Sequence, residues 1–280
     1  MATSGKDFRL ESDLIGERQI SNEHLYGVQT LRGIENFNIS NFHLCDYPLF
    51  IHGLAWTKEA AAIANHRLGL LTDQQKDAIV QACHELLEGK HHQHFPVDMI
   101  QGGAGTTTNM NANEVICNRA LEIMGHEKGE FKYLSPNDHV NGSQSTNDAY
   151  PTAIHLGLYA SHLKLRPHFI QLIEALEKKS KEFAHVVKMG RTQLQDAVPM
   201  TLGQTFGGFA SILRHEIANL DYAAHQFLAI NMGATAIGTG ISSEPEYAGY
   251  CTEAMAKITG WDITLTEDLI GATSNTSEMV

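Results

Sequence analysis

The chain has 280 residues, of which 42% are hydrophobic and 19% charged, and this is ordinary usage for a folded globular protein. Its 20 basic and 32 acidic residues give a formal charge of −12, and no basic run interrupts that balance, so nucleic-acid binding is not expected. The first residues are polar and no stretch of roughly 18 apolar residues occurs, so we expect neither a signal peptide nor a membrane span.

The first third of the chain predicts a short irregular segment followed by helices. Residues up to about 45 are mixed and rich in turn formers, so we expect irregular structure with a short hairpin. From Pro48 to Leu70 the pattern is helical, with alanines that suit close helix contacts. Thr72 and Gln75 form a capping-box signature for a following helix, which we expect to end at Gly89.

The second half is dominated by two long helical patterns. One runs from about Pro151 to Ala184, with a kink expected at Pro167, and the other runs from Leu202 to Phe227. Helices this long with a narrow apolar seam usually pack lengthwise against other long helices. Two of them cannot close a bundle, so their partners must come from further chain or from other subunits.

Three polar turns punctuated by glycine precede helical patterns, at Gln101–Asn109, Gly142–Asp148 and Lys188–Asp196. A helix start leaves backbone N–H groups unpaired and carries the positive end of the helix dipole, so it favours anions. Ser145, Thr146 and Asn147 add short hydrogen-bond donors to such a start. The alternative is an over-supplied helix cap, because these residue types also cap helices. Three such turns could converge on one multiply charged ligand.

Several other motifs favour structural roles. Gly233–Gly240 resembles a phosphate loop but has Thr239 where that loop needs Lys, so we expect a tight turn near the end of a bundle helix. His91, His92 and His94 lack the spacing of a zinc site and indicate a solvated loop, so no metal site is predicted. The amides of Asn109, Asn111 and Asn113 indicate buried hydrogen-bond networks, and the alternative is that one of them faces a ligand. No Gly-x-Ser-x-Gly hydrolase motif occurs.

The four cysteines are widely spaced and lack the close pairs of a metal or redox motif. We therefore expect buried thiols in a reducing, cytoplasmic environment. They are Cys45, Cys83, Cys117 and Cys251.

Taken together, these segments resemble the aspartase/fumarase superfamily, and within it the aspartate ammonia-lyases, from about Leu10 to the last residue. Fumarases typically have His where this chain has Gln193; some aspartases share that His, so Gln193 argues against a fumarase without excluding an aspartase. The motifs that carry the resemblance are Gly102-Gly103-Ala104-Gly105-Thr106, His139-Val140-Asn141-Gly142-Ser143-Gln144-Ser145-Thr146-Asn147-Asp148 and Gly190-Arg191-Thr192-Gln193-Leu194-Gln195-Asp196-Ala197.

The resemblance implies a mainly α fold. It implies an N-terminal α-rich lyase domain over residues 1–142, followed by long helices of the superfamily's central helical bundle over residues 143–280, with the C-terminal part of the family fold absent. It also implies a homotetramer in the full-length protein, in which each active site draws three segments from different subunits. The family's chemistry needs no organic cofactor, although divalent cations activate some members.

The activity implied by the resemblance is reversible elimination of ammonia from L-aspartate to give fumarate, through a carbanion intermediate. The donors that would hold the dicarboxylate substrate are Thr106, Ser145, Thr146, Asn147, Thr192 and Gln193. Arg32 is a weaker candidate for a carboxylate partner, with a surface ion pair as the alternative, and Arg191 is as readily explained by bonds to its own turn.

One departure limits this expectation. The family's signature loop, which contains the serine that acts as general base and a substrate-binding lysine, lies beyond the point where this sequence ends. We therefore expect a fragment that is catalytically incomplete by itself. Two alternatives stay open: a class II fumarase, which malate formation would distinguish from ammonia release, and a non-catalytic helical scaffold or pseudoenzyme, which a native stop codon after Val280 would favour.

Overall fold

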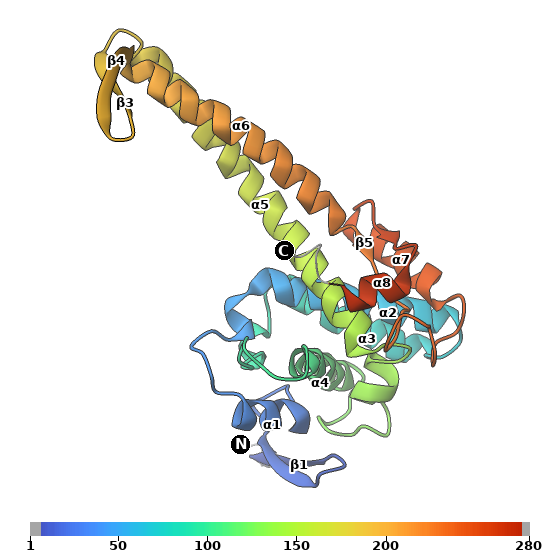
Figure 1. Ribbon diagram of the computed structural model, residues 1–280. Helices are drawn as coiled ribbons and strands as arrows, with labels where there is room; N and C mark the ends of the chain where they lie inside the picture. The colour runs from blue at the N-terminus through green and yellow to red at the C-terminus, as the bar shows by residue number, and fades with distance from the viewer. Residues whose placement is uncertain (1–6, 276–280) are drawn as a thin grey trace. The chain divides into compact units, whose positions relative to one another are not determined.

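The computed structural model describes residues 7–275, and the ends of both predicted domains, residues 1–6 and 276–280, lie outside that part. The described chain is mainly helical, as predicted (Figure 1). Its contacts divide it into two compact units: unit 1 combines the residues up to Leu158 with those from Phe227 onward, and unit 2 spans Tyr159–Gln226. This division does not coincide with the predicted domain boundary after residue 142, which stays a prediction.

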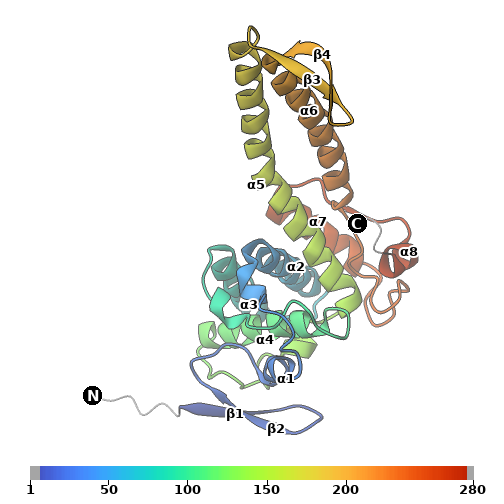
Figure 2. The same cartoon turned by 60° about the vertical axis from the view of Figure 1, so that its left-hand side comes forward.

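Unit 1 begins with the expected hairpin, in which β1 (Phe8–Ser12) pairs antiparallel with β2 (Glu17–Ser21). Figure 2 shows this hairpin beside α1 (Val28–Asn36), a helix that the sequence did not predict. The backbone N–H of Val28 donates to Glu11 at 2.9 Å, and that of Gln29 donates to Glu114 at 2.8 Å. Because these carboxylates replace a local side-chain cap, the start of α1 leaves no capping signature in its own sequence.

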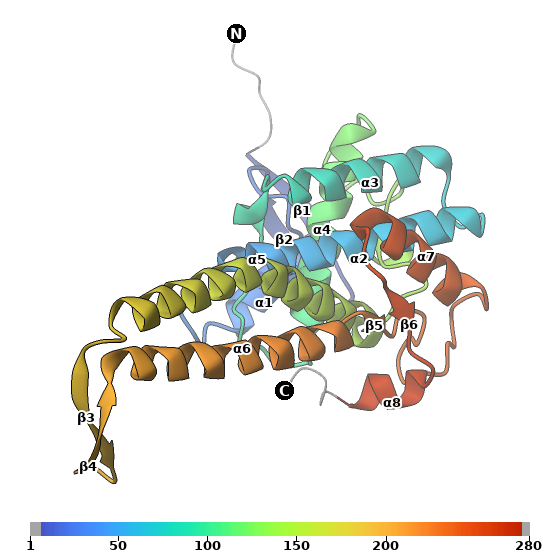
Figure 3. The same ribbon diagram turned by 90° about the horizontal axis from the view of Figure 1, so that it is seen from above.

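Helices form the body of unit 1, and the predicted Thr72–Gln75 capping box is present. The apolar core consists mainly of residues from the three helices over Pro48–Arg67, Asp73–Leu87 and Thr106–Ile123 and from the segments that connect them. Figure 3 shows α2 (Pro48–Arg67) running alongside α7 (Tyr247–Thr259), the two helices in contact. The elements are η1 (Leu44–Asp46), α2 (Pro48–Arg67), α3 (Asp73–Leu87), η2 (His92–His94), α4 (Thr106–Ile123), η3 (Pro136–Val140), β5 (Ala229–Ile230), α7 (Tyr247–Thr259), β6 (Thr264–Leu265), parallel to β5, and α8 (Leu269–Ser274).

The two long helices are confirmed. The first, α5 (Thr146–Glu182), begins earlier than expected and continues through Pro167 without interruption, and α6 (Leu202–Gln226) matches the second pattern. Within unit 2 the two helices lie side by side, and Arg166 on α5 binds both carboxylate oxygens of Asp221 on α6 (Figure 1). Among residues 7–275, no helix combines the length and the apolar composition that crossing a membrane requires.

The prediction that the third polar turn, Lys188–Asp196, leads directly into a helix is wrong. Residues 187–201 form a hairpin of β3 (Val187–Thr192) and β4 (Gln195–Thr201), and α6 starts only after β4 ends. Gln193 and Leu194 form the two-residue turn, with φ angles of 45° and 67°, and this left-handed conformation suits tight hairpins. Pro199 is tolerated inside β4 because a two-stranded sheet leaves each strand with an unpaired edge.

Candidate functional site

A pocket of about 280 Å³ lies in unit 1, where two of the three polar turns meet. Ala104 and Gly105, from the loop before α4, form part of its lining. Thr146, Asn147 and Tyr150, from the first turns of α5, form another part. The segment around α8 completes it, and this contribution was not foreseen.

Glycine is required at position 105 for the loop to reach the wall of α5. Its φ of 88° is left-handed, and a Cβ placed there would lie 2.5 Å from the ring of Tyr150. Gly103 and Ala104 also have positive φ angles, of 85° and 51°. The glycines therefore allow a sharply turned loop that lies directly against an aromatic ring of α5.

Thr106 and Ser145 lie at the two helix starts but do not line the pocket. Thr106 is the first residue of α4, and its hydroxyl donates to the Gly103 carbonyl at 2.7 Å. The Ser145 hydroxyl accepts from the backbone N–H of Asn147 at 3.2 Å, as a helix cap does. Both hydroxyls therefore stabilise local turns in this structure.

Thr146 and Asn147 do line the pocket. The Thr146 hydroxyl accepts a hydrogen bond from the Asn109 amide at 3.1 Å. The Asn147 amide donates to the Ala236 carbonyl at 2.7 Å. Positioned at the start of a 37-residue helix, these side chains add polar groups to the positive end of a long dipole.

Asp148 holds the start of α5 against the glycine-rich loop that follows β5. Its fully buried carboxylate accepts from the backbone N–H groups of Ser145 at 2.9 Å, Thr235 at 2.9 Å and Gly233 at 3.2 Å. Burial raises the pKa of Asp148 to about 6, while these N–H donors oppose the shift. The loop is thus a structural partner of the site, and Asp148 is a residue to which sequence reasoning gave no role.

A buried amide network lies behind Thr146. The Lys58 ammonium, on α2, donates to Asn109 at 2.7 Å, Gln144 at 2.8 Å and Asn141 at 3.0 Å. The prediction of buried networks for the amides of α4 is confirmed, because Asn113 also donates to Asn141 and Asn111 donates to the His94 carbonyl. Lys58 was missed, although a lysine within an alanine-rich apolar helix was a visible signal.

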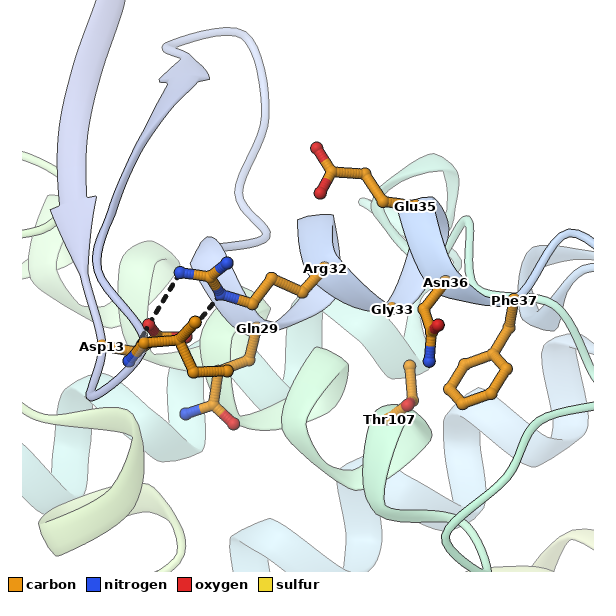
Figure 4. A pocket seen from close by; sticks show the side chains of 9 residues that line it. Asp13, Gln29, Arg32, Gly33, Glu35, Asn36, Phe37 and Thr107 are labelled. Atoms are coloured by element: carbon orange, nitrogen blue, oxygen red, sulfur yellow. Dashed lines mark hydrogen bonds and ion pairs between the residues drawn. The ribbon is translucent and has the colours of Figure 1, made fainter.

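The remaining predicted site residues lie elsewhere. Thr192 and Gln193 belong to unit 2, at the tip of the β3–β4 hairpin, where Arg191 pairs with Asp196 at 3.0 Å. Arg32 lines a second pocket of unit 1, of about 500 Å³. Its guanidinium binds both carboxylate oxygens of Asp13, at 2.8 and 2.9 Å (Figure 4).

The ion pair of Arg32 and Asp13 is partly shielded from solvent, with side-chain exposures of 17% and 14%. The hydrogen bonds from Arg32 hold the pKa of the Asp13 carboxyl below its usual value.

The prediction of buried thiols is confirmed for Cys83, Cys117 and Cys251, whereas Cys45 is only partly buried.

Comparison with known proteins gives a consistent result. The protein family described as Lyase matches residues 16–280. An aspartate ammonia-lyase from Pseudomonas canavaninivorans is 52% identical over 99% of this chain, which covers 59% of that protein.

Solved structures agree. A fumarate lyase:delta crystallin from Brucella melitensis, bound to cobalt, superposes with a TM-score of 0.94 and 46% identity over 97% of this chain and 59% of its own. A class II fumarase from Schistosoma mansoni gives a TM-score of 0.86 and 33% identity, over 95% of this chain and 59% of its own. The chain thus spans about three fifths of the length of these relatives.

Proposed function

Since the chain belongs to the Lyase family, we propose that it carries the substrate-binding portion of an aspartate ammonia-lyase, which reversibly eliminates ammonia from L-aspartate to give fumarate. The observation that supports this most is the pocket at the start of α5, where Thr146 and Asn147 face the Ala104–Gly105 loop. A helix start with hydroxyl and amide side chains suits a carboxylate. The 52% identity to an aspartate ammonia-lyase favours aspartate over other dicarboxylates.

The proposed chemistry gives a role to the polar side chains that line the pocket, Thr146 and Asn147 among them. Removing a proton from the carbon next to a carboxylate places a second negative charge on that group. Preorganised donors aimed at this charge lower the barrier, and losing one of them typically costs about 10²-fold or more in rate. Hydroxyl and amide groups provide such donors without competing for the proton that the reaction removes.

The general base is a separate matter, because the residues that line the pocket include no Asp, Glu, His, Lys or Cys. In the family, a serine loop that this sequence does not contain supplies the base. We therefore propose that the 280 residues bind a dicarboxylate but do not turn it over alone. We further propose that Thr106, Ser145, Thr192 and Gln193 contribute in a cytoplasmic assembly of four copies, in which several chains share one site.

A chimera tests the activity. Residues 1–280 would replace the matching part of the Pseudomonas canavaninivorans aspartate ammonia-lyase, and fumarate formation from L-aspartate would be followed by its absorbance. We expect turnover, which Thr146→Val should lower by about 10²-fold in kcat/KM. Thr107→Val is the matched control, because Thr107 lines the Arg32 pocket instead, and it should leave the rate within about threefold.

Other outcomes separate the alternatives. Malate formation from fumarate without ammonia release from aspartate would identify a fumarase. A folded chimera inactive on both substrates would favour the non-catalytic scaffold. Turnover by the 280-residue chain alone, at an ordinary enzymatic rate, would show that the base lies within it.

A further inference from the structure

The ammonium group of Lys58 is completely buried and is connected to the pocket through one side chain. Its Nζ donates to the side-chain oxygens of Asn109, Gln144 and Asn141 at 2.7, 2.8 and 3.0 Å. Asn109 in turn contacts the hydroxyl of Thr146, which lines the pocket. A buried charge therefore lies two hydrogen bonds from a hydroxyl that lines the pocket.

The direction of these hydrogen bonds follows from the chemistry of the ammonium. An ammonium group only donates, so every amide that touches it must present its oxygen. Asn109 therefore turns Oδ1 toward Lys58 and Nδ2 away from it. The two Nδ2 protons are directed at Asn141 Oδ1, 3.0 Å away, and at Thr146 Oγ1, 3.1 Å away.

The hydrogen bond from Asn109 limits the directions in which the Thr146 hydroxyl can donate its own proton. A hydroxyl has one proton to donate and accepts through its lone pairs. Because Thr146 Oγ1 accepts from Asn109, its own proton points away from Asn109. We propose that Lys58 is a positioning residue, which acts through Asn109 to aim the Thr146 hydroxyl proton into the pocket, toward an anionic oxygen of the ligand. This inference rests on the proposed function and specifies how its carboxylate is recognised.

The protonation of Lys58 matters to this arrangement. An ammonium offers three protons to three amide oxygens, whereas a neutral amine would turn a lone pair toward one of them. Burial lowers the pKa of Lys58 to about 7, and the charge of the Asp148 carboxylate opposes that shift. The thiols of Cys83 and Cys251 are the other titratable groups that influence Lys58. The three amide oxygens thus match the charged form.

Neutron diffraction from crystals of the deuterated 280-residue chain tests the direction without any ligand. The deuteron on Thr146 Oγ1 should point away from Asn109, and one deuteron on Asn109 Nδ2 should point toward Thr146. A Thr146 deuteron directed at the Asn109 side chain would overturn the proposal. This result is independent of whether the chain has lyase activity.

Succinate binding tests the consequence. Calorimetric titration of succinate would compare the wild-type chain with Lys58→Met, Thr146→Val and the double variant. Each single change should weaken binding about tenfold, and the double variant should be no weaker than Thr146→Val alone. Wild-type affinity in Lys58→Met, or losses that multiply in the double variant, would show that Lys58 does not act through Thr146.

Asn109→Asp covers the case in which Lys58→Met fails to fold. The new carboxylate still accepts from Lys58 but cannot donate to Thr146, so the hydroxyl should turn inward and succinate affinity should fall about tenfold. Asn113→Asp adds the same charge to the network without touching Thr146. An equal loss in both variants would attribute the effect to charge and refute the proposal. If the wild-type chain binds no succinate, the proposed function loses support, while the neutron result still decides the role of Lys58.

Discussion

At the scale of a single residue, Gly105 allows the loop before α4 to lie directly against α5 in the pocket lining. Its left-handed backbone starts α4, and its missing side chain leaves room for the ring of Tyr150 on α5. Gly103 shares the left-handed conformation, but a Cβ there would meet Thr106 at an ordinary 3.7 Å. A comparison of alanine substitutions at the two positions therefore separates the cost of a left-handed backbone from the cost of a steric overlap.

We predict that Gly105→Ala destabilises the protein more than Gly103→Ala. Left-handed alanine costs about 1–2 kcal/mol at either position. At position 105 the overlap with Tyr150 adds about 1–3 kcal/mol, because the contact is with the ring itself rather than with a flexible chain end. Urea denaturation of both variants measures the difference. Equal losses in the free energy of unfolding would mean that Tyr150 moves aside at little cost.

At the scale of elements, a close approach between α2 and α5 supports the site from behind. A Cβ on Gly53 would lie 2.1 Å from the carbonyl oxygen of Ala153, and one on Gly157 would lie 3.0 Å from that of Leu49. The obstacle in each case is backbone, which cannot rotate away. Contact at this distance fixes the first turns of α5 against α2, the helix that carries Lys58.

Gly53→Ala should therefore lower the free energy of unfolding by about 1–3 kcal/mol, even though alanine is the better helix former. Gly249→Ala, within α7 of the same unit, is the matched control, because a Cβ there has no neighbour within 4 Å. That variant should gain about 0.4–1 kcal/mol. Opposite signs in chemical denaturation are the expected result. A gain in both variants would show that α2 and α5 separate freely.

A second link between elements depends on pH. Glu85 on α3 accepts from both Nε and Nη2 of Arg119 on α4, at 2.6 and 2.9 Å, and from His91 at 2.7 Å. The hydrogen bonds from Arg119, helped by the one from His91, lower the pKa of Glu85 to about 2. The ionised form is thus the one that joins the two helices.

Glu85→Gln should cost about 1–3 kcal/mol at pH 7. As pH falls from about 4.5 toward 2, the unfolded chain takes up this proton before the folded chain does, so wild-type stability should decline through that window and Glu85→Gln should lack this contribution. Glu88→Gln is the control, because Glu88 is 60% exposed in its pair with Lys90. Parallel pH profiles for wild type and Glu85→Gln would contradict the prediction.

At the scale of the whole molecule, the sequence predicted what short-range patterns encode. Apolar periodicity located α2, α3, α5 and α6, and the Thr72–Gln75 pair located a helix start. It missed α1, whose start depends on Glu114, which is distant in the sequence. It also placed the third turn before a helix, because polar residues with glycine suit hairpins and helix starts alike.

The site was predictable to a similar degree. Thr146 and Asn147 follow from helix-start chemistry, and both line the pocket. Lys58 and Asp148 were not assigned, because a buried charge is recognisable only when its partners are known, and apart from Ser145 those partners lie 51 to 87 residues away in the sequence. The same limit applies to unit 2, because the sequence does not identify what would cover its exposed apolar side chains in the proposed assembly.

The last prediction concerns that assembly. On α6, Phe209 and Ile212 are 51% and 59% exposed, and on α5 Leu172 is 48% exposed. A pair of helices buries only the faces between them, and exposed apolar side chains of this size are typical of contact surfaces. If copies of the chain cover these faces, as the proposed tetramer requires, a Phe209→Asp and Ile212→Asp double variant should dissociate.

Sedimentation velocity at micromolar concentration measures this. The wild type should sediment well above the 30.8 kDa of one chain, and the double variant should approach that mass. Ser211→Asp and Ala218→Asp, at exposed positions on the opposite side of the same helix, add the same charges away from Phe209 and Ile212 and should leave the assembly intact. Circular dichroism must show equal helix content, so that dissociation is distinguished from unfolding. A monomeric wild type would remove the assembly from the proposed function and leave the α5 pocket to act within one chain.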